Sequence, residues 1–203
     1  MKKAILLVVF LVLAFTAYKI FSPNKPVGED KKDSSLSVSS NSGSFNGAIF
    51  TLIGYYNEVK SALVDWDTLR ANQAALKLGH FSDSLSFKEL KADSSIVETA
   101  ANFASSMSGE CKGFLGEASI EQKRRSFNML TDELYNLIRT VQYSGEIIYH
   151  IRCPMAFDDS LEGFWLNNSN KIINPYLGRK HPKYNDKMVG CGEVVDSLNF
   201  GKK

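Results

Sequence analysis

The stretch SIEQKRRSFNMLTDELYNLIRTV (Ser119–Val141) decides the fold class, because it carries both a helix start signal and a helical repeat of apolar residues. Ser119 and Gln122 have the spacing of a capping box, in which each side chain satisfies a backbone N–H at the start of the helix. The apolar residues then recur at steps of three and four, which places them on one helix face. We expect this helix to end near Gly145, and its apolar face consists of Phe127, Leu130, Leu134, Leu137, Ile138 and Val141.

The same period appears upstream, from Ala48 onwards. A first amphipathic helix is predicted there, with the polar residues of the segment lying away from its apolar face. Asp65 or Asp67 is a suitable cap for a second helix, Thr68 to Leu78, which Gly79 is expected to end in a left-handed conformation. The apolar face of the first helix consists of Ile49, Leu52, Ile53, Tyr56, Val59, Leu63 and Trp66.

A further helix is predicted between these and the segment at Ser119. Ser95 and Glu98 repeat the capping-box spacing before an Ala-rich run that we expect to stop at Gly109. The chain is therefore predicted to be all-α, an antiparallel bundle of three to four helices over residues 47–145.

Residues 146–203 lose the helical period. Glu146 to Arg152 is rich in β-branched and aromatic residues and is compatible with a short strand, and Pro and Gly then interrupt the chain repeatedly. We expect a loop-rich C-terminal segment packed on the bundle. Such a segment has little core of its own, so it needs a metal, a disulfide or extensive docking to hold it.

The N-terminus predicts export. Lys2 and Lys3 precede an uncharged apolar run, so residues 1–21 are expected to be a signal peptide or an N-terminal membrane anchor. Residues 22–46 are polar and rich in Ser, which is typical of a flexible linker. We therefore expect a periplasmic domain, either anchored to the inner membrane or released by cleavage, whose only membrane contact is the N-terminal segment.

Composition excludes some functions. The net charge of +2 is too small to indicate binding to nucleic acid. The chain has no Gly-rich phosphate loop, nucleophile elbow, Cys-x-x-Cys pair or HExxH helix. We therefore expect a protein that is not an enzyme.

Soft ligands gather in the C-terminal segment, in the runs HIRCPM and MVGCG. Imidazole, thiolate and thioether are the side chains that Cu(I) prefers, and Trp165 is available as an aromatic neighbour of the ion. Zn(II) would need a fourth donor such as Asp158 or Asp159, so we favour Cu(I) as the bound ion. The predicted metal ligands are His150, Cys153, Met155, Met188 and Cys191.

Structural alternatives remain open for each of these residues. Cys153 and Cys191 are suited equally to a disulfide, because exported proteins fold in oxidising surroundings. His150 is compatible with a satisfied core histidine, and Met155 and Met188 with core filling. A third hypothesis, a thiol oxidoreductase, requires one accessible cysteine of low pKa.

Several motifs are similar to those of a known family. The strings HIRCPMAFDDSLEGFWL, KIINPYLG and KMVGCGEV, together with YYNEVKSALVDWDTLRANQAALKL upstream, resemble the domain-of-unknown-function family numbered 3347. The resemblance covers about Phe45 to Ser197. One departure is the insertion RKHPKYND ahead of Met188.

The resemblance implies a helical bundle, a periplasmic location and a connection to metal handling. Similar domains are fused to adaptor subunits of copper and silver efflux pumps, which implies a metal efflux adaptor as partner. The resemblance does not imply a particular activity.

Overall fold

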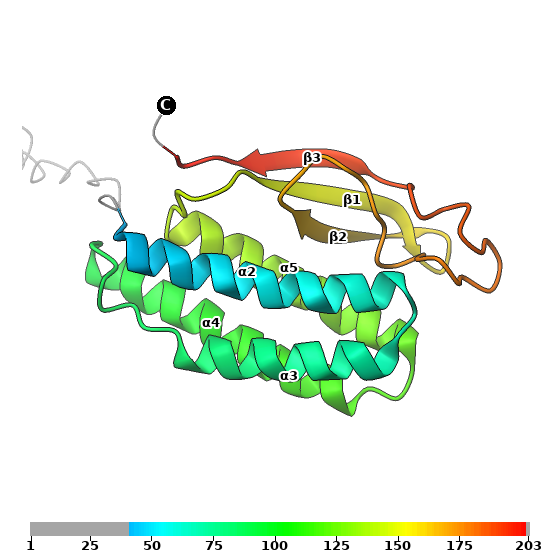
Figure 1. Cartoon of the computed structure of the whole chain (residues 1–203), viewed down its shortest axis with the longest axis horizontal. Helices are drawn as coiled ribbons and strands as arrows, with labels where there is room; N and C mark the ends of the chain where they lie inside the picture. The colour runs from blue at the N-terminus through cyan, green and yellow to red at the C-terminus, as the bar shows by residue number, and fades with distance from the viewer. Residues whose placement is uncertain (1–40, 202–203) are drawn as a thin grey trace, which may run out of the picture. The chain divides into compact units, whose positions relative to one another are not determined.

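The computed structural model describes residues 41–201. The predicted signal or anchor at 1–21 and all but the last residues of the predicted linker at 22–46 lie outside this range. Within it, four helices are followed by a three-stranded antiparallel sheet (Figure 1). None of the helices in residues 41–201 has the length and apolar character needed to cross a membrane.

The helices form an up-and-down bundle in which each one packs against the next in the chain. The C-terminal sheet lies over the α2 and α5 side of this bundle (Figure 1). The apolar faces predicted for the first and last of these helices are buried in one core, except that Trp66 lies beyond the end of α2 and is only partly buried. The four helices are α2 (Gly43–Val64), α3 (Thr68–Ser84), α4 (Ser94–Gly116) and α5 (Ile120–Thr140).

Three of the four helix starts are capped by a side chain. Ser42 and Asp67 accept hydrogen bonds from backbone N–H groups in the first turns of α2 and α3. The capping box of Ser119 and Gln122 is confirmed. The box predicted at Ser95 is wrong, because the N-cap of α4 is Asp93, two residues earlier, and the Asp93 side chain makes no capping hydrogen bond.

Gly79 does not end a helix, contrary to the sequence prediction. It lies within α3, where a Cβ would come within 2.9 Å of the Cβ of Cys111 on α4. Its missing side chain therefore lets two helices approach closely. Likewise α4 continues through Gly109, and α5 ends at Thr140, before Gly145.

The prediction of an all-α chain is wrong, because the C-terminal segment contains a sheet of order β2-β1-β3. The strand suspected at Glu146 to Arg152 is real but longer. The neighbouring strands escaped the sequence analysis because β2 is short and β3 is exposed along most of its length, so neither shows a clear alternation. The strands are β1 (Ile148–Phe157), β2 (Leu161–Asn167) and β3 (Glu193–Leu198).

The outer edge of β2 faces the bundle and is covered by side chains. Asn128 of α5 accepts a hydrogen bond from the backbone N–H of Phe164 at 2.8 Å, and the Tyr176 hydroxyl donates to the Phe164 carbonyl. Two residues along, Leu166 bonds with side chains of α2. An uncovered strand edge pairs readily with other chains, so these contacts protect the sheet as well as attach it to the helices.

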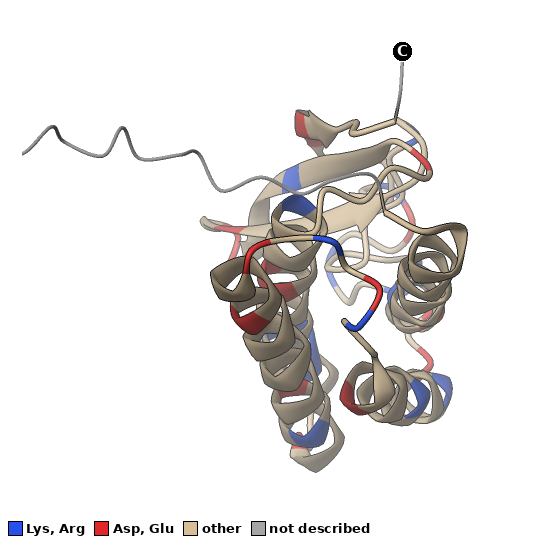
Figure 2. Ribbon diagram, turned by 90° about the vertical axis from the view of Figure 1, so that its left-hand side faces the viewer, with Lys and Arg blue, Asp and Glu red and all other residues tan. Residues whose placement is uncertain are grey.

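Charges of both signs are interspersed on the helices and on the connections between them (Figure 2). Exposed ion pairs such as Lys77 with Glu58 join neighbouring helices. Pairs of this kind contribute little to stability because water screens them. The bundle is therefore held mainly by its apolar core.

Candidate functional site

Strand β1 sorts the predicted ligands onto two faces. Its pairing with β2 is regular from Tyr149 to Cys153, so side chains alternate between the faces over this stretch. Ile151 and Cys153 share one face, and His150 and Arg152 share the other. Cys153 and His150 are therefore three residues apart in sequence but on opposite sides of the sheet.

Cys153 and Cys191 are brought together by the fold. Their Sγ atoms are 3.9 Å apart, although 37 residues separate them in the chain. Both are free thiols, Cys153 fully buried and Cys191 partly buried. This is the clearest meeting of metal-binding side chains among residues 41–201.

Asn174 holds the loop that carries Cys191. Its side-chain amide donates to the Cys191 carbonyl at 2.8 Å, and its backbone N–H donates to the Val189 carbonyl at 2.8 Å. The Asn174 side-chain oxygen accepts from the backbone N–H groups of Tyr176 and Leu177. Asn174 is fully buried, so this one residue fixes both its own turn and the position of the second thiol.

The sequence did not predict a role for Asn174. The available signal was an Asn directly before Pro175, a pair typical of turns. That pattern predicts the local turn. It does not predict that the same amide group reaches a carbonyl 17 residues further along the chain.

His150 is held between two aromatic rings. Its ring centroid is 4.4 Å from that of Tyr135 and 5.0 Å from that of Phe164. Burial lowers its pKa, and the opposing carboxylate of Asp196 partly offsets the effect. Its Nε2 is buried and has no hydrogen-bond partner within residues 41–201. His150 is thus separated from the thiol pair and occupies an aromatic environment.

The two methionines flank the thiols in sequence. Met155 lies in the irregular part of β1, between the paired residues Cys153 and Phe157, and is partly buried. Met188 is partly buried, and its carbonyl accepts a hydrogen bond from the Cys191 N–H at 3.0 Å. Both side chains pack against the core.

Trp165 lies beside the loop that carries the second thiol. Its side chain is fully buried, and its ring lies against Gly192, the residue after Cys191. A Cβ on Gly192 would come within 2.7 Å of the Trp165 ring. The close packing of the indole on this loop helps to fix Cys191.

Cys191 is a poor nucleophile at neutral pH. Burial and the neighbouring Cys153 raise the pKa of Cys191 to about 11. Catalytic and redox-active thiols have a lowered pKa, so this environment is the opposite of the one that a thiol oxidoreductase needs.

Other candidate ligands lie elsewhere. In the described part of the chain, neither Asp158 nor Asp159 joins the thiols in a group that could hold a metal ion, and the two carboxylates pair instead with Arg125 and Lys183. Among residues 41–201, no group of three or more His, Cys, Asp or Glu side chains is arranged to hold a metal ion. Any ion at the thiol pair would therefore need donors of another kind.

Comparison with known proteins identifies the helical part of the chain. No curated protein and no solved structure matches it. One family model matches residues 52–145, from within α2 to just beyond α5. The match is thus shorter than the stretch from Phe45 to Ser197 over which the resemblance was expected, and it ends before the sheet. Residues 52–145 are therefore similar to the family described as "Protein of unknown function (DUF3347)".

Proposed function

We propose that this is an exported, non-enzymatic protein that binds a soft metal ion, Cu(I), through Cys153 and Cys191. The observation that carries the proposal is the 3.9 Å between the two sulfur atoms. Two sulfur ligands about 2.3 Å from one ion, at a near-tetrahedral angle, are about 3.8 Å apart. The thiols thus need almost no movement to bind an ion together.

The remaining ligands in this proposal are thioethers. Met155 and Met188 each lie two or three residues from one of the cysteines, and thioethers with thiolates favour Cu(I) over harder ions. We leave His150 out of the coordination sphere, because it lies on the other face of β1. In this proposal the protein carries the ion and does not use it for catalysis.

The setting of the proposal comes from the N-terminal sequence and the family resemblance. An export signal or anchor followed by a polar linker would hold the domain in the periplasm, close to the inner membrane. There it would buffer Cu(I) or deliver it to a metal efflux adaptor, as part of heavy-metal homeostasis.

Titration of the reduced full chain with Cu(I) against a competing chelator tests this function. We expect one ion to bind with at least micromolar affinity. Cys153→Ser or Cys191→Ser should abolish binding, and Met155→Ala with Met188→Ala should weaken it at least about tenfold. Cys111→Ser is the matched control, since that thiol is buried between α3 and α4. Failure to bind, or equal loss in the Cys111 variant, would refute the proposal.

A disulfide-stapled interaction module is the second candidate. It is favoured by the same thiol pair, because closing it to a bond of about 2.05 Å requires only a local movement of the Cys191 loop. The bundle would then recognise a partner, and the sheet would be its covalently fixed cover. Intact mass before and after alkylation distinguishes the two candidates: a native loss of two hydrogens without bound metal favours the disulfide.

A further inference from the structure

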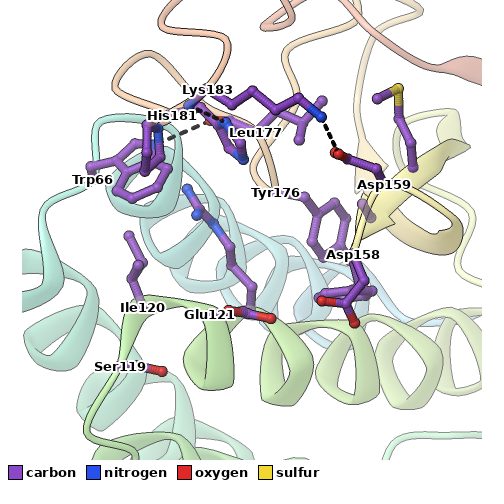
Figure 3. A pocket seen from close by; sticks show the side chains of 15 residues that line it. Trp66, Ser119, Ile120, Glu121, Asp158, Asp159, Tyr176, Leu177, His181 and Lys183 are labelled. Atoms are coloured by element: carbon purple, nitrogen blue, oxygen red, sulfur yellow. Dashed lines mark hydrogen bonds and ion pairs between the residues drawn. The ribbon is translucent and has the colours of Figure 1, made fainter.

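A pocket of about 440 Å³ lies away from the thiol pair, between the start of α5, the β1–β2 turn and the loop after Leu177. Its size lies within the range of small-molecule sites. Trp66 and His181 lie on one side of it, Asp158 and Asp159 on the other, and Glu121 between them (Figure 3). Met155, a ligand in the proposed metal function, also lines this pocket, but neither Cys153 nor Cys191 does.

Arg124 is the cation buried in this pocket. Its residue is only 4 % exposed, and its guanidinium lies 4.1 Å from the centre of the Trp66 ring. Nε and Nη2 donate to the carbonyls of Pro175 and Leu63, at 2.9 Å and 3.2 Å. Glu121 is near enough to act on this charge electrostatically, but no carboxylate in residues 41–201 lies within ion-pair distance of it, and Nη1 makes no hydrogen bond there. A buried charge normally forms an ion pair, and the Arg124 guanidinium lacks one.

His181 adds a second donor on the same side. Its Nδ1 accepts the backbone N–H groups of Lys183 and Tyr184, at 3.2 Å and 3.3 Å. This arrangement leaves the proton of the neutral ring on Nε2. Burial and the nearby Arg124 lower the pKa of His181, which keeps the ring neutral at physiological pH. The Arg124 side of the pocket thus has free N–H donors and a positive charge that has the Trp66 ring but no ion pair.

The rest of the pocket has a surplus of negative charge, with Glu121 between the two sides and Asp158 opposite Trp66 and His181 (Figure 3). Glu121 and Asp158 both pair with the single guanidinium of Arg125, at 3.3 Å and 3.0 Å, so one of the two carboxylates is not neutralised. Both side chains are more than half exposed, which places them at the rim. Asp159 is balanced by its own ion pair with Lys183.

Apolar side chains also line the pocket. They include Ile120, Phe157 and Leu177. A ligand that is complementary to all of these surfaces carries an anion and a cation close together, because Glu121 lies between the two sides, and an apolar group beside them. A simple anion would meet the rim carboxylates, and a simple cation would meet Arg124.

We propose that this pocket binds a small amphipathic zwitterion, an α-amino acid with an apolar side chain. Its carboxylate accepts from Arg124 Nη1 and His181 Nε2, and its ammonium group lies at Glu121 and Asp158. The proposal is independent of the thiol pair.

Matched probes test each end of the ligand separately. The full chain is titrated calorimetrically with L-phenylalanine, L-leucine and L-methionine, then with N-acetyl-L-phenylalanine, which lacks the cation, and L-phenylalaninamide, which lacks the anion. We expect at least one of the free amino acids to bind, and phenylalanine to bind at least about tenfold more tightly than either of its derivatives, a difference typical of one lost charged contact. Absence of binding by all three amino acids up to about 10 mM, or equal binding of either derivative, overturns the proposal.

Variants locate the site. Arg124→Gln should abolish binding, but this side chain also links the Leu63 and Pro175 carbonyls, so its loss has a structural cost. Asp158→Asn avoids this difficulty, because Asp158 is exposed. It should weaken phenylalanine binding at least about fivefold while leaving N-acetylphenylalanine unaffected. Asp83→Asn is the matched control, since Asp83 pairs with Lys112 outside the pocket. Equal affinities of the Asp158 and Asp83 variants contradict the assignment.

Discussion

The backbone N–H of Leu166 donates a 3.1 Å hydrogen bond to the hydroxyl oxygen of Tyr56, and this contact joins the edge of β2 to α2. The Tyr56 hydroxyl donates in turn to Thr131 of α5 at 2.7 Å, since the Thr131 hydroxyl is itself committed to the Phe127 carbonyl. One buried phenol thus connects the sheet with both helices beneath it.

Tyr56→Phe should therefore destabilise the protein. The change leaves the Leu166 N–H without its acceptor in a buried position, which costs about 1–3 kcal/mol. Urea unfolding followed by circular dichroism measures the loss. Tyr55→Phe is the control, because the Tyr55 hydroxyl makes no hydrogen bond among the described residues, and it should change the free energy of unfolding by less than about 0.5 kcal/mol.

Lys60 should make stability depend on pH. Its Nζ donates to the Leu166 carbonyl at 2.8 Å and to Asn57 and Asn167, and burial lowers its pKa to about 7. The unfolded chain keeps this proton up to about pH 10. Between these values the unfolded state binds more protons, so the free energy of unfolding rises with pH, by up to about 1.4 kcal/mol per unit.

Urea unfolding at pH 7, 8 and 9 measures this slope. In Lys60→Met the rise should disappear. Lys77→Met should keep it, because Lys77 is exposed in its ion pair with Glu58. A wild-type stability that is flat or falls over this range contradicts the assignment to Lys60.

The two capping-box spacings should differ in their effect on stability. Ser119→Ala removes a side chain that accepts the Gln122 N–H at 3.2 Å, and should cost about 1 kcal/mol. Ser95→Ala should cost little, because Ser95 lies inside the first turn of α4 and caps nothing. Thermal unfolding of the two variants side by side checks the difference, and similar losses would contradict it.

Gly192 and Gly190 flank Cys191, and substitution by alanine should destabilise the protein at Gly192 but not at Gly190. At Gly192 φ is +147°, and a Cβ would come within 2.7 Å of the Trp165 ring and 2.9 Å of the Arg152 carbonyl. Gly192→Ala should therefore destabilise by about 2 kcal/mol or more and weaken Cu(I) binding. Gly190→Ala meets no atom within 4 Å and should leave both stability and binding nearly unchanged.

Metal binding should be steeply dependent on pH. Cys191 must lose a proton to bind the ion, and its pKa is raised to about 11. The apparent affinity for Cu(I) should then rise by at least about one order of magnitude per pH unit near neutrality, because this proton is released on binding. Competition titrations at pH 6.5, 7.0 and 7.5 measure the slope, and an affinity that does not change with pH would rule out a dithiolate site.

Local sequence signals predicted the helices well. The apolar faces of α2 and α5 and the Ser119 capping box follow from spacing alone, because each depends on residues within one or two turns. The helix end predicted at Gly79 was wrong, because the sequence does not distinguish a glycine that ends a helix from one that lets a neighbouring helix pack closely. The sheet was missed for a related reason: β3 is paired to β1 by backbone hydrogen bonds but has almost no buried side chains.

The candidate site was likewise predicted only in part from the sequence. Residue types alone identified Cys153 and Cys191, and the fold places their sulfur atoms 3.9 Å apart. The sequence could not assign His150 to a face of β1, because strand pairing sets the alternation. It gave no sign that Arg124 lacks an ion pair.

By itself, then, the sequence determined a bundle of helices with defined starts and a C-terminal segment rich in soft ligands, since these properties depend on near neighbours in the chain. Only the tertiary structure decided that the segment is a sheet attached edge-on to α2 and α5, that its thiols meet, and that Arg124 lines a pocket. Each of these depends on contacts between residues far apart in the chain, such as Tyr56 with Leu166, whose energies exist only once the whole fold is formed.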